Sequence, residues 1–259
     1  MNTINVNLCE TSRELDMKLL FEKYPYGPGP SMLFDFAMNK LKVIPEEWAT
    51  RPDSDKPLIL DAGGGYGRDA SDFINYSKNI IIADRNKSNY KILTELYSEP
   101  KRKNIGFVNV NLTDDNCSKV ILSDQGDNSK DKANVDFIYS YQLLHLLDEN
   151  ELDKAFNNFA ILLRKGCCML HIFLADRCPL TKIDNGQNRT YNGEVVKYNG
   201  HDENVLKNMA KNHGFSLENS DALPSGLNYI YVVELHAQYG HDEPQLHRHI
   251  MWAMCCKRK

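Results

Sequence analysis

Short apolar runs recur through the middle of the chain, separated by polar or amphipathic stretches. Five of these runs predict strands, at residues 58–62, 79–83, 105–110, 134–140 and 167–174. Apolar residues at helical spacing predict helices between several of them, near residues 67–77, 87–98 and 148–164. Strands that alternate with helices in this way are typical of a parallel sheet with helices on its faces. The pattern therefore predicts an α/β protein with a doubly wound sheet.

Both flanks of this core have a different pattern. Before it, residues 11–23 and 31–43 predict amphipathic helices, and the proline- and glycine-rich residues 24–30 between them cannot be helical. After it, residues 203–212 predict a helix. Three further runs predict strands, at residues 215–220, 229–236 and 249–256, the last as an antiparallel edge strand. We therefore expect a helical extension over residues 1–50 and one α/β domain over 51–259, with a loop or lid insertion around 175–200.

Composition and charge narrow the class of protein. A chain of 259 residues is long enough for one sizeable α/β domain. The formal net charge of −4 leaves no basic footprint, which argues against a dedicated nucleic-acid binder. No apolar run is long enough to cross a bilayer, and the first residues lack the pattern of a secretory signal. Seven cysteines without a C-x-x-C spacing indicate structural thiols and no zinc site, so we expect a cytoplasmic protein.

The most specific chemical signal is a glycine-rich turn directly after the first predicted strand. The sequence LILDAGGGYGRDA covers residues 58–70 and has glycines at positions 63, 64, 65 and 67. Glycine permits a positive φ and lets the backbone approach a nucleotide-like ligand. The next apolar run ends at Asp84, about twenty residues after the turn, where a second strand would place a carboxylate over a ribose. Asp61 and Asp84 therefore bracket a predicted nucleotide site.

Two classes of ligand compete for this turn. The dinucleotide pattern G-x-G-x-x-G needs a third glycine, and that position holds Arg68 or Ala70, depending on the register. An acid at the end of the first strand, Asp61, does not suit a pyrophosphate bound by backbone amides. It suits a ligand with a positive charge or with hydroxyl and amino groups. A nicotinamide-dependent oxidoreductase is thus the less favoured alternative.

With these residues in view, the core resembles the class I S-adenosylmethionine-dependent methyltransferases. Residues 61–67, DAGGGYG, match the family pattern D/E-x-G-x-G-x-G, and residues 135–147, VDFIYSYQLLHLL, are similar to its F-D-x-V-x-S-x-x-x-L-H stretch. Residues 106–115, GFVNVNLTDD, resemble the third strand, with Asn111 near the position where the family has an acid at the adenine amine. The GRDA at 67–70 and the lysine that ends the closing strand resemble the tellurite-resistance-type and related small-molecule methyltransferases.

The resemblance implies a mostly parallel seven-stranded sheet of the Rossmann-like methyltransferase type, with S-adenosylmethionine as cofactor. It implies that Gly63 and Gly65 lie against the cofactor, that Asp84 binds the ribose, and that Tyr139 and Ser140 lie at its methionine end. In full, the expected cofactor-binding residues are Asp61, Ala62, Gly63, Gly65, Arg68, Asp84, Arg85, Asn111, Leu112, Tyr139, Ser140 and Tyr24.

Catalytic residues are harder to assign, because the sulfonium leaving group is already activated and methyl transfer does not always need a general base. His145 follows the fourth strand and is a candidate base, although a packing or helix-capping role is favoured for it. Tyr26 is the second catalytic candidate, since Tyr24 and Tyr26 could close over the ligands so that the helical extension covers the active site; a simple packing turn is the alternative. His171 is expected to be buried and hydrogen-bonded. The histidines of the tail lack metal-ligand spacing, and no metal is expected: His236, His241, His247 and His249.

The acceptor is expected to be a small molecule. The fourth strand ends in Tyr-Ser-Tyr-Gln and lacks the Asn/Asp-Pro-Pro-aromatic signature of many DNA methyltransferases, so no nucleic-acid partner is favoured. A protein methyltransferase and a catalytically silent module that only binds S-adenosylmethionine remain alternatives. Side chains around the predicted lid are candidates for acceptor recognition: Arg177, Arg189, Tyr191, Tyr198 and His201.

Overall fold

The computed structural model describes most of the α/β core. The described residues are 5–6, 34, 42, 44–97, 102–123, 134–178, 189–191, 194–196, 198–220, 223, 225–236 and 245–259. The predicted helices at 11–23 and 31–43 and the turn at 24–30 lie outside them, except for residue 34 and residue 42. Much of the predicted lid at 175–200 lies outside them too.

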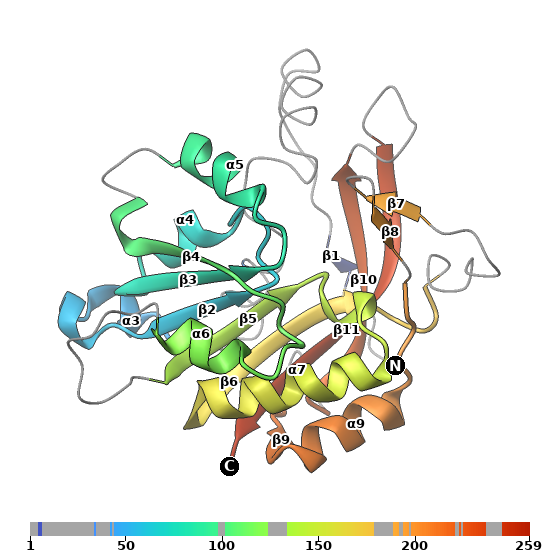
Figure 1. Ribbon diagram of the computed structural model, residues 1–259. Helices are drawn as coiled ribbons and strands as arrows, with labels where there is room; N and C mark the ends of the chain where they lie inside the picture. Colours follow the sequence, from blue (N-terminus) through green and yellow to red (C-terminus); the bar gives the residue numbers. More distant parts are fainter. Residues whose placement is uncertain are drawn as a thin grey trace.

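A mostly parallel sheet forms the centre of the described structure (Figure 1). Its parallel strands are β2 (Leu58–Ala62), β3 (Asn79–Asp84), β4 (Ile105–Asn109), β5 (Val135–Tyr141) and β6 (Leu163–Leu174). The C-terminal strands are β9 (Phe215–Leu217), β10 (Leu227–His236) and β11 (Gln245–Arg258). The order is β1-β10-β11-β6-β5-β2-β3-β4, with β1 (Asn5–Val6) parallel to β10 and with β9 paired to β11. The seven strands from β4 to β10 confirm the predicted seven-stranded sheet.

The predicted edge strand is instead an interior one. β11 is antiparallel, as expected, but it pairs with β10 on one side and with β6 on the other. The run from Met251 to Cys256 is buried throughout. A continuous apolar run of this kind is typical of a strand with both faces covered, whereas an edge strand would expose polar positions.

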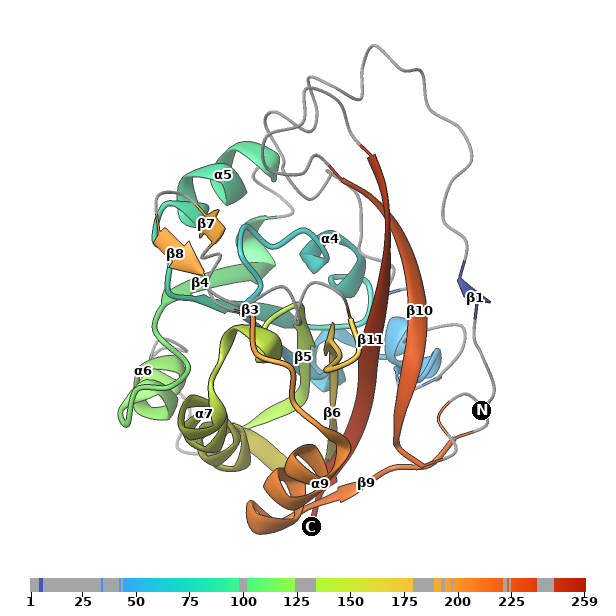
Figure 2. The ribbon, with the colours of Figure 1, turned by 90° about the vertical axis from the view of Figure 1, so that its right-hand side faces the viewer.

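Helices cover both faces of the sheet (Figure 2). One apolar cluster packs α6 (Cys117–Ser123), α7 (Glu149–Leu162) and α9 (Glu203–Asn212) against one face. The other cluster packs α4 (Ala70–Phe73) and α5 (Asn89–Leu96) against the opposite face. The remaining described elements are α3 (Glu47–Thr50), the 3-10 turns η2 (Asp53–Asp55), η3 (Arg102–Asn104) and η4 (Leu144–Leu146), and the hairpin of β7 (Arg189–Tyr191) and β8 (Glu194–Val196).

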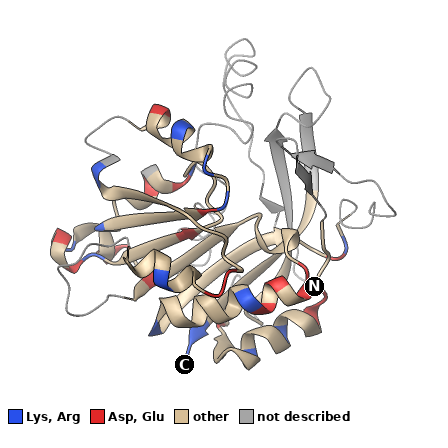
Figure 3. Ribbon diagram, in the orientation of Figure 1, with Lys and Arg blue, Asp and Glu red and all other residues tan. Residues whose placement is uncertain are grey.

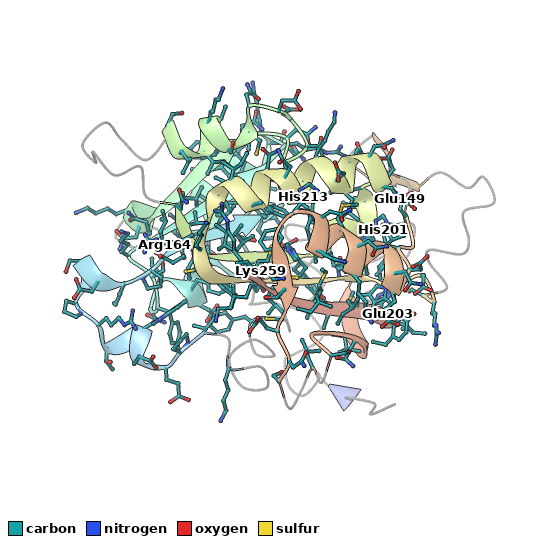
Figure 4. All side chains as sticks on the ribbon, turned by 90° about the horizontal axis from the view of Figure 1, so that it is seen from below. Glu149, Arg164, His201, Glu203, His213 and Lys259 are labelled. Atoms are coloured by element: carbon teal, nitrogen blue, oxygen red, sulfur yellow. The ribbon has the colours of Figure 1, made fainter. Side chains whose placement is uncertain are left out.

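Side-chain hydrogen bonds explain how α7 begins and how α9 is attached to it. Asp148 and Glu151 form a reciprocal capping box at the start of α7, where each side chain accepts from the other residue's backbone N–H. At the end of α9, His213 lies against α7 (Figure 4), with its Nε2 2.8 Å from Oδ1 of Asp153. The two helices therefore form one layer below the sheet.

One predicted helix is shorter than expected, and one observed helix was not predicted. The helix predicted over 67–77 is reduced to α4, because Gly67 has a φ of +75°, which a right-handed helix cannot contain. α6 was not predicted, since its seven residues are too short for a clear periodicity. Basic and acidic residues are interspersed along α5, α7 and α9 (Figure 3). Among the described helices, none combines the length and the apolar character that a membrane span needs.

Candidate functional site

The glycine-rich turn joins β2 to α4 at the carboxyl edge of the parallel strands. Three of its glycines are required by close packing, and a Cβ at the first of them, Gly63, would lie 2.8 Å from Cδ1 of Leu143. A Cβ at Gly64 would lie 2.4 Å from Cγ of Asp61, and a Cβ at Gly67 would lie 2.3 Å from Cδ1 of Ile82. Gly65 differs, because the only atom near its would-be Cβ within the described residues is Nδ2 of Asn89 at 3.8 Å. The backbone at Gly65 is therefore open to a ligand, which fits a nucleotide-type cofactor.

Asp84 holds this turn in place from the end of β3. Its Oδ2 accepts from the N–H of Gly65 at 3.0 Å. Its Oδ1 accepts from the N–H of Asn86 at 2.7 Å and from the side-chain amide of Asn89 at 3.2 Å. Burial raises the pKa of Asp84, and these donors and Arg85 oppose that rise. The carboxylate thus lies beside the open backbone of Gly65 with acceptor capacity left for a hydroxyl group.

Asp61 lies beneath the turn and is only 3% exposed. Burial raises its pKa well above the usual value, and the carboxylates of Asp69 and Asp84 raise it further, while Arg68 lowers it. Within the described residues, no donor hydrogen-bonds its carboxyl group, in contrast to that of Asp84. A negatively charged ligand group would meet repulsion here, whereas a positively charged one would be stabilised.

A network of tyrosines fixes the residues around Asp61. The hydroxyl of Tyr139 donates to Oδ2 of the buried Asp69, which links β5 to the start of α4. The hydroxyl of Tyr97 donates to the carbonyl of Gly67, which links the end of α5 to the same turn. Sequence reasoning did not identify Asp69 or Tyr97 as site residues. Both contacts join residues that are 30 or more positions apart, so no local pattern signals them.

The other expected cofactor residues fall into two groups. Arg68 lies with its guanidinium 5.5 Å from the ring centroid of Tyr141, and Arg85 is exposed after β3. Ala62 and Gly63 follow Asp61 in the chain, and the N–H of Gly63 donates to the carbonyl of Ala83 at 2.8 Å. These residues gather around the turn.

Asn111 and Leu112 follow β4, at the same edge of the sheet. Oδ1 of Asn111 accepts from the N–H of Thr113 at 3.3 Å, and Leu112 is buried. The carbonyl of Leu112 accepts from Nδ2 of Asn158 on α7 at 2.9 Å. The segment after β4 is therefore fixed, as a binding wall requires. Tyr24 and Tyr26 lie outside the described residues.

Tyr139 and Ser140 are placed differently from each other. The side chain of Tyr139 is fully buried next to Asp61, its neighbour in the register of β2 and β5. Ser140 is buried on the opposite face, and its Oγ has no hydrogen-bond partner among the described residues. Its register partner His171 is buried as expected, but the expected hydrogen bond is absent, because neither ring nitrogen has a partner within the described part of the chain.

His145 is buried in η4, beyond the end of β5. Its Nδ1 accepts from the N–H of Leu174 at 3.4 Å, and its ring packs on Tyr198 with centroids 5.1 Å apart. Burial lowers its pKa to about 3, and His201 and His249 lower it too, so the ring is neutral at pH 7. With Nδ1 occupied, the remaining nitrogen carries the proton and acts as a donor. This geometry favours the packing role over that of a base.

Two of the described acceptor candidates, Tyr198 and His201, contact η4. Nε2 of His201 donates to the carbonyl of Leu144 at 3.1 Å, which places the 198–201 segment beside η4. The guanidinium of Arg177 lies over the ring of Tyr229 at 4.6 Å. His249 is buried in β11, and the described residues contain no group that could hold a metal ion. Side chains outside the described set are those of Arg189, Tyr191, His236, His241 and His247.

Comparisons with known proteins support the fold. No protein-family model and no curated sequence matches the chain. A crystal structure of an S-adenosylmethionine-dependent methyltransferase from Anabaena variabilis is 14% identical, with a TM-score of 0.58 over 94% of this chain and 87% of that one. TehB from Haemophilus influenzae is 15% identical, with a TM-score of 0.51 over 86% of this chain and 66% of that one.

A third similar structure is the magnesium protoporphyrin IX methyltransferase of Synechocystis PCC 6803 with bound S-adenosylhomocysteine. It is 13% identical, with a TM-score of 0.51 over 92% of this chain and 94% of that one. At such low identity, these likenesses establish a shared fold. The chain therefore has the class I methyltransferase fold, with its antiparallel strand inserted beside β10.

Proposed function

We propose that this protein transfers the methyl group of S-adenosylmethionine to a small-molecule acceptor. One arrangement carries the proposal: the open backbone at Gly65 lies between the buried carboxyl group of Asp61 and the fixed carboxylate of Asp84. A ligand that fits has a ribose on one side and a positive charge on the other. S-adenosylmethionine has both.

The proposed contacts follow from the chemistry of each group. Gly63 and Gly65 offer a backbone surface, and Asp84 accepts a hydrogen bond from a ribose hydroxyl. Asn111 and Leu112 flank the adenine, with Arg68 and Arg85 at the rim of the site. Ala62, Tyr139 and Ser140 line or support the methionine half, and Tyr24 and Tyr26 cover it.

The same arrangement argues against a nicotinamide cofactor. A dinucleotide would place a negatively charged pyrophosphate against the turn. Asp61 and Asp84 already flank the turn, and Asp69 lies close enough to Asp61 to raise its pKa. Repulsion from these carboxylates would weaken pyrophosphate binding.

When bound, the cofactor supplies a methyl group on a positively charged sulfur, which is a good leaving group. The residues of this chain then bind, orient and exclude water. No general base is assigned, because Nδ1 of His145 is already occupied by the N–H of Leu174. We expect the acceptor to lie near Tyr198 and His201, beyond the ends of β5 and β6.

Two observations support a small acceptor. Charged residues on the described helices are interspersed rather than gathered into a basic stripe (Figure 3). The name of one similar structure, magnesium protoporphyrin IX methyltransferase, is that of an enzyme acting on a small molecule.

Calorimetric titration with S-adenosylmethionine, S-adenosylhomocysteine and NAD tests the cofactor. We expect micromolar binding of the two sulfur nucleotides and none of NAD; the reverse result would overturn the proposal. Formation of S-adenosylhomocysteine is then measured with the small-molecule filtrate and with the protein fraction of a cell extract. Turnover with the filtrate supports the proposal, turnover with the protein fraction alone indicates a protein methyltransferase, and binding without turnover indicates a silent module.

A further inference from the structure

A stack of three side chains lies beside the segment that follows β6. Tyr229 of β10 and Trp252 of β11 are register partners, and their rings stack with centroids 3.7 Å apart. The guanidinium of Arg177 lies over the Tyr229 ring, 4.6 Å from its centroid. Because the indole covers one face of this ring, the guanidinium covers the other. Trp252 also pairs with Phe173, one residue before the end of β6, so the stack lies at the carboxyl edge of the sheet, where ligands bind.

Each layer of this stack is held by the residues around it. Trp252 is buried, and its Nε1 donates to the carbonyl of His201 at 2.9 Å. The hydroxyl of Tyr229 donates to Oδ1 of Asp176 at 2.8 Å. Residues 175–178 form a turn that is closed by a backbone hydrogen bond of 2.9 Å. The guanidinium therefore rests on a rigid support before any ligand binds, which lowers the entropic cost of using it for recognition.

The hydrogen-bonding edge of Arg177 is open. Its side chain is exposed, and within the described residues no carboxylate forms an ion pair with it. The two acids that act on the neighbouring Tyr229 are engaged elsewhere. Asp176 accepts from Tyr229 itself, and Glu203, at the start of α9 (Figure 4), pairs with Lys207 at 2.5 Å. Stacking covers a face of the guanidinium but leaves its N–H groups free to donate in the plane.

The stack is continuous with the region where we expect the acceptor. The carbonyl of His201 accepts from Trp252, and Nε2 of His201 donates to the carbonyl of Leu144 in η4 at 3.1 Å. One chain of contacts thus joins η4 to the stack. In the sheet, β5 and β6 separate β11 from β2, which carries the glycine-rich turn. Arg177 therefore lies on the side of the acceptor region that is remote from the turn.

We propose that the methyl acceptor carries a carboxylate group, and that this group binds the open edge of Arg177. This inference rests on the proposed function and deepens it, because it names the class of substrate. A planar carboxylate matches the guanidinium fork with two parallel hydrogen bonds. A phosphate monoester carries about −1.5 to −2 charges at pH 7, and Asp176 and Glu203 near the stack would repel the additional charge. A single negative charge fits the site better.

The first experiment tests the acceptor. The small-molecule filtrate of a cell extract supplies it, and transfer of a labelled methyl group from S-adenosylmethionine is the readout. One portion is treated with a carbodiimide and methylamine, which converts carboxylates to neutral amides. A second portion is treated with a phosphatase, which removes phosphate monoesters, and a third is left untreated. After removal of the reagents, we expect turnover to be lost in the first portion and kept in the other two.

The second experiment tests the residue with the active fraction of the filtrate. Arg177→Gln should raise the apparent KM for the acceptor by roughly 10- to 150-fold, because charge-assisted hydrogen bonds are lost. Arg177→Lys keeps the charge but loses the fork, so its KM should lie between the two. Neither variant should change the KM for S-adenosylmethionine or the calorimetric affinity for S-adenosylhomocysteine. Arg51→Gln changes an exposed arginine directly after α3 and should leave all of these values unchanged.

The outcomes separate this inference from the proposed function. Turnover that survives amidation would overturn the carboxylate, and its loss after phosphatase treatment instead would indicate a phosphorylated acceptor. An acceptor KM in Arg177→Gln equal to that in Arg51→Gln would overturn the role of Arg177, as would an equal loss of affinity for S-adenosylhomocysteine, which a structural role would cause. Each of these results leaves the proposed function standing. Absence of turnover with every portion would overturn the proposed function and this inference with it.

Discussion

Replacement of Asp84 by alanine tests the candidate site most directly. The carboxylate receives N–H donors from Gly65 at 3.0 Å, Asn86 at 2.7 Å and Asn89 at 3.2 Å, so it both shapes the turn and faces its open side. A hydrogen bond to a charged group contributes about 1.5–3 kcal/mol. Loss of a single ribose contact should therefore weaken binding of S-adenosylhomocysteine by roughly 10- to 150-fold.

Two roles of Asp84 have to be separated, because loss of its bonds to the turn would also weaken binding. A double-mutant cycle does this with adenosine and its 2′- and 3′-deoxy analogues as ligands. If Asp84 binds a ribose hydroxyl, one deoxy analogue should bind the natural protein more weakly than adenosine does, and Asp84→Ala should bind the two equally. Asp53→Ala, an exposed acid in η2, serves as the control and should retain the natural preference.

Calorimetry gives each affinity, and urea denaturation shows whether the variant is folded at the temperature used. An affinity for S-adenosylhomocysteine that is unchanged in folded Asp84→Ala would refute the assignment of the site. A preference for adenosine over both deoxy analogues that survives in Asp84→Ala would refute the ribose contact alone.

Three further predictions concern stability and can be checked by urea denaturation. Gly67→Ala should lower the free energy of unfolding by about 1–3 kcal/mol, since its φ of +75° and the closeness of Ile82 both oppose a Cβ; an unchanged value would contradict the packing of the turn. Asp148→Ala should cost about 0.5–2 kcal/mol, because the capping box with Glu151 is lost, and a change below this range would mean that the box contributes little. His171→Leu should raise stability at pH 7, because two buried nitrogens without partners are removed. Burial lowers the pKa of His171 to about 3, so the unfolded state takes up a proton below about pH 6.5 and the folded state does not. As the pH is lowered below about 6.5, His171 should therefore reduce the free energy of unfolding of the natural protein by about 1.4 kcal/mol per pH unit. If the stability of His171→Leu falls just as steeply with decreasing pH, His171 does not contribute.

Local patterns in the sequence were sufficient for the parallel strands and for the centre of the site. Residues 58–62 and 79–83 match β2 and β3 within one residue, because a short apolar run bounded by turn residues reports a buried strand directly. Asp61 and Asp84 follow from the same logic, since a residue at the end of a parallel strand lies at the edge where ligands bind. The glycine-rich run likewise predicted a tight turn in which a positive φ is permitted, and Gly63, Gly65 and Gly67 have a positive φ.

Contacts between distant segments were decided only by the tertiary structure. The apolar run of β11 indicates a buried strand but does not identify its neighbours, and its place between β10 and β6 depends on pairing with strands formed elsewhere in the chain. Tyr139 reaches Asp69 across 70 positions, and the N–H of Leu174 reaches His145 across 29. Such pairs leave no periodic signal, because hydrogen bonds between strands and turns depend on the register of the whole sheet. The sequence by itself therefore determined the parallel strands and the glycine-rich turn with its flanking acids, and the packed sheet determined the burial, the charge interactions and the hydrogen-bond partners of these residues.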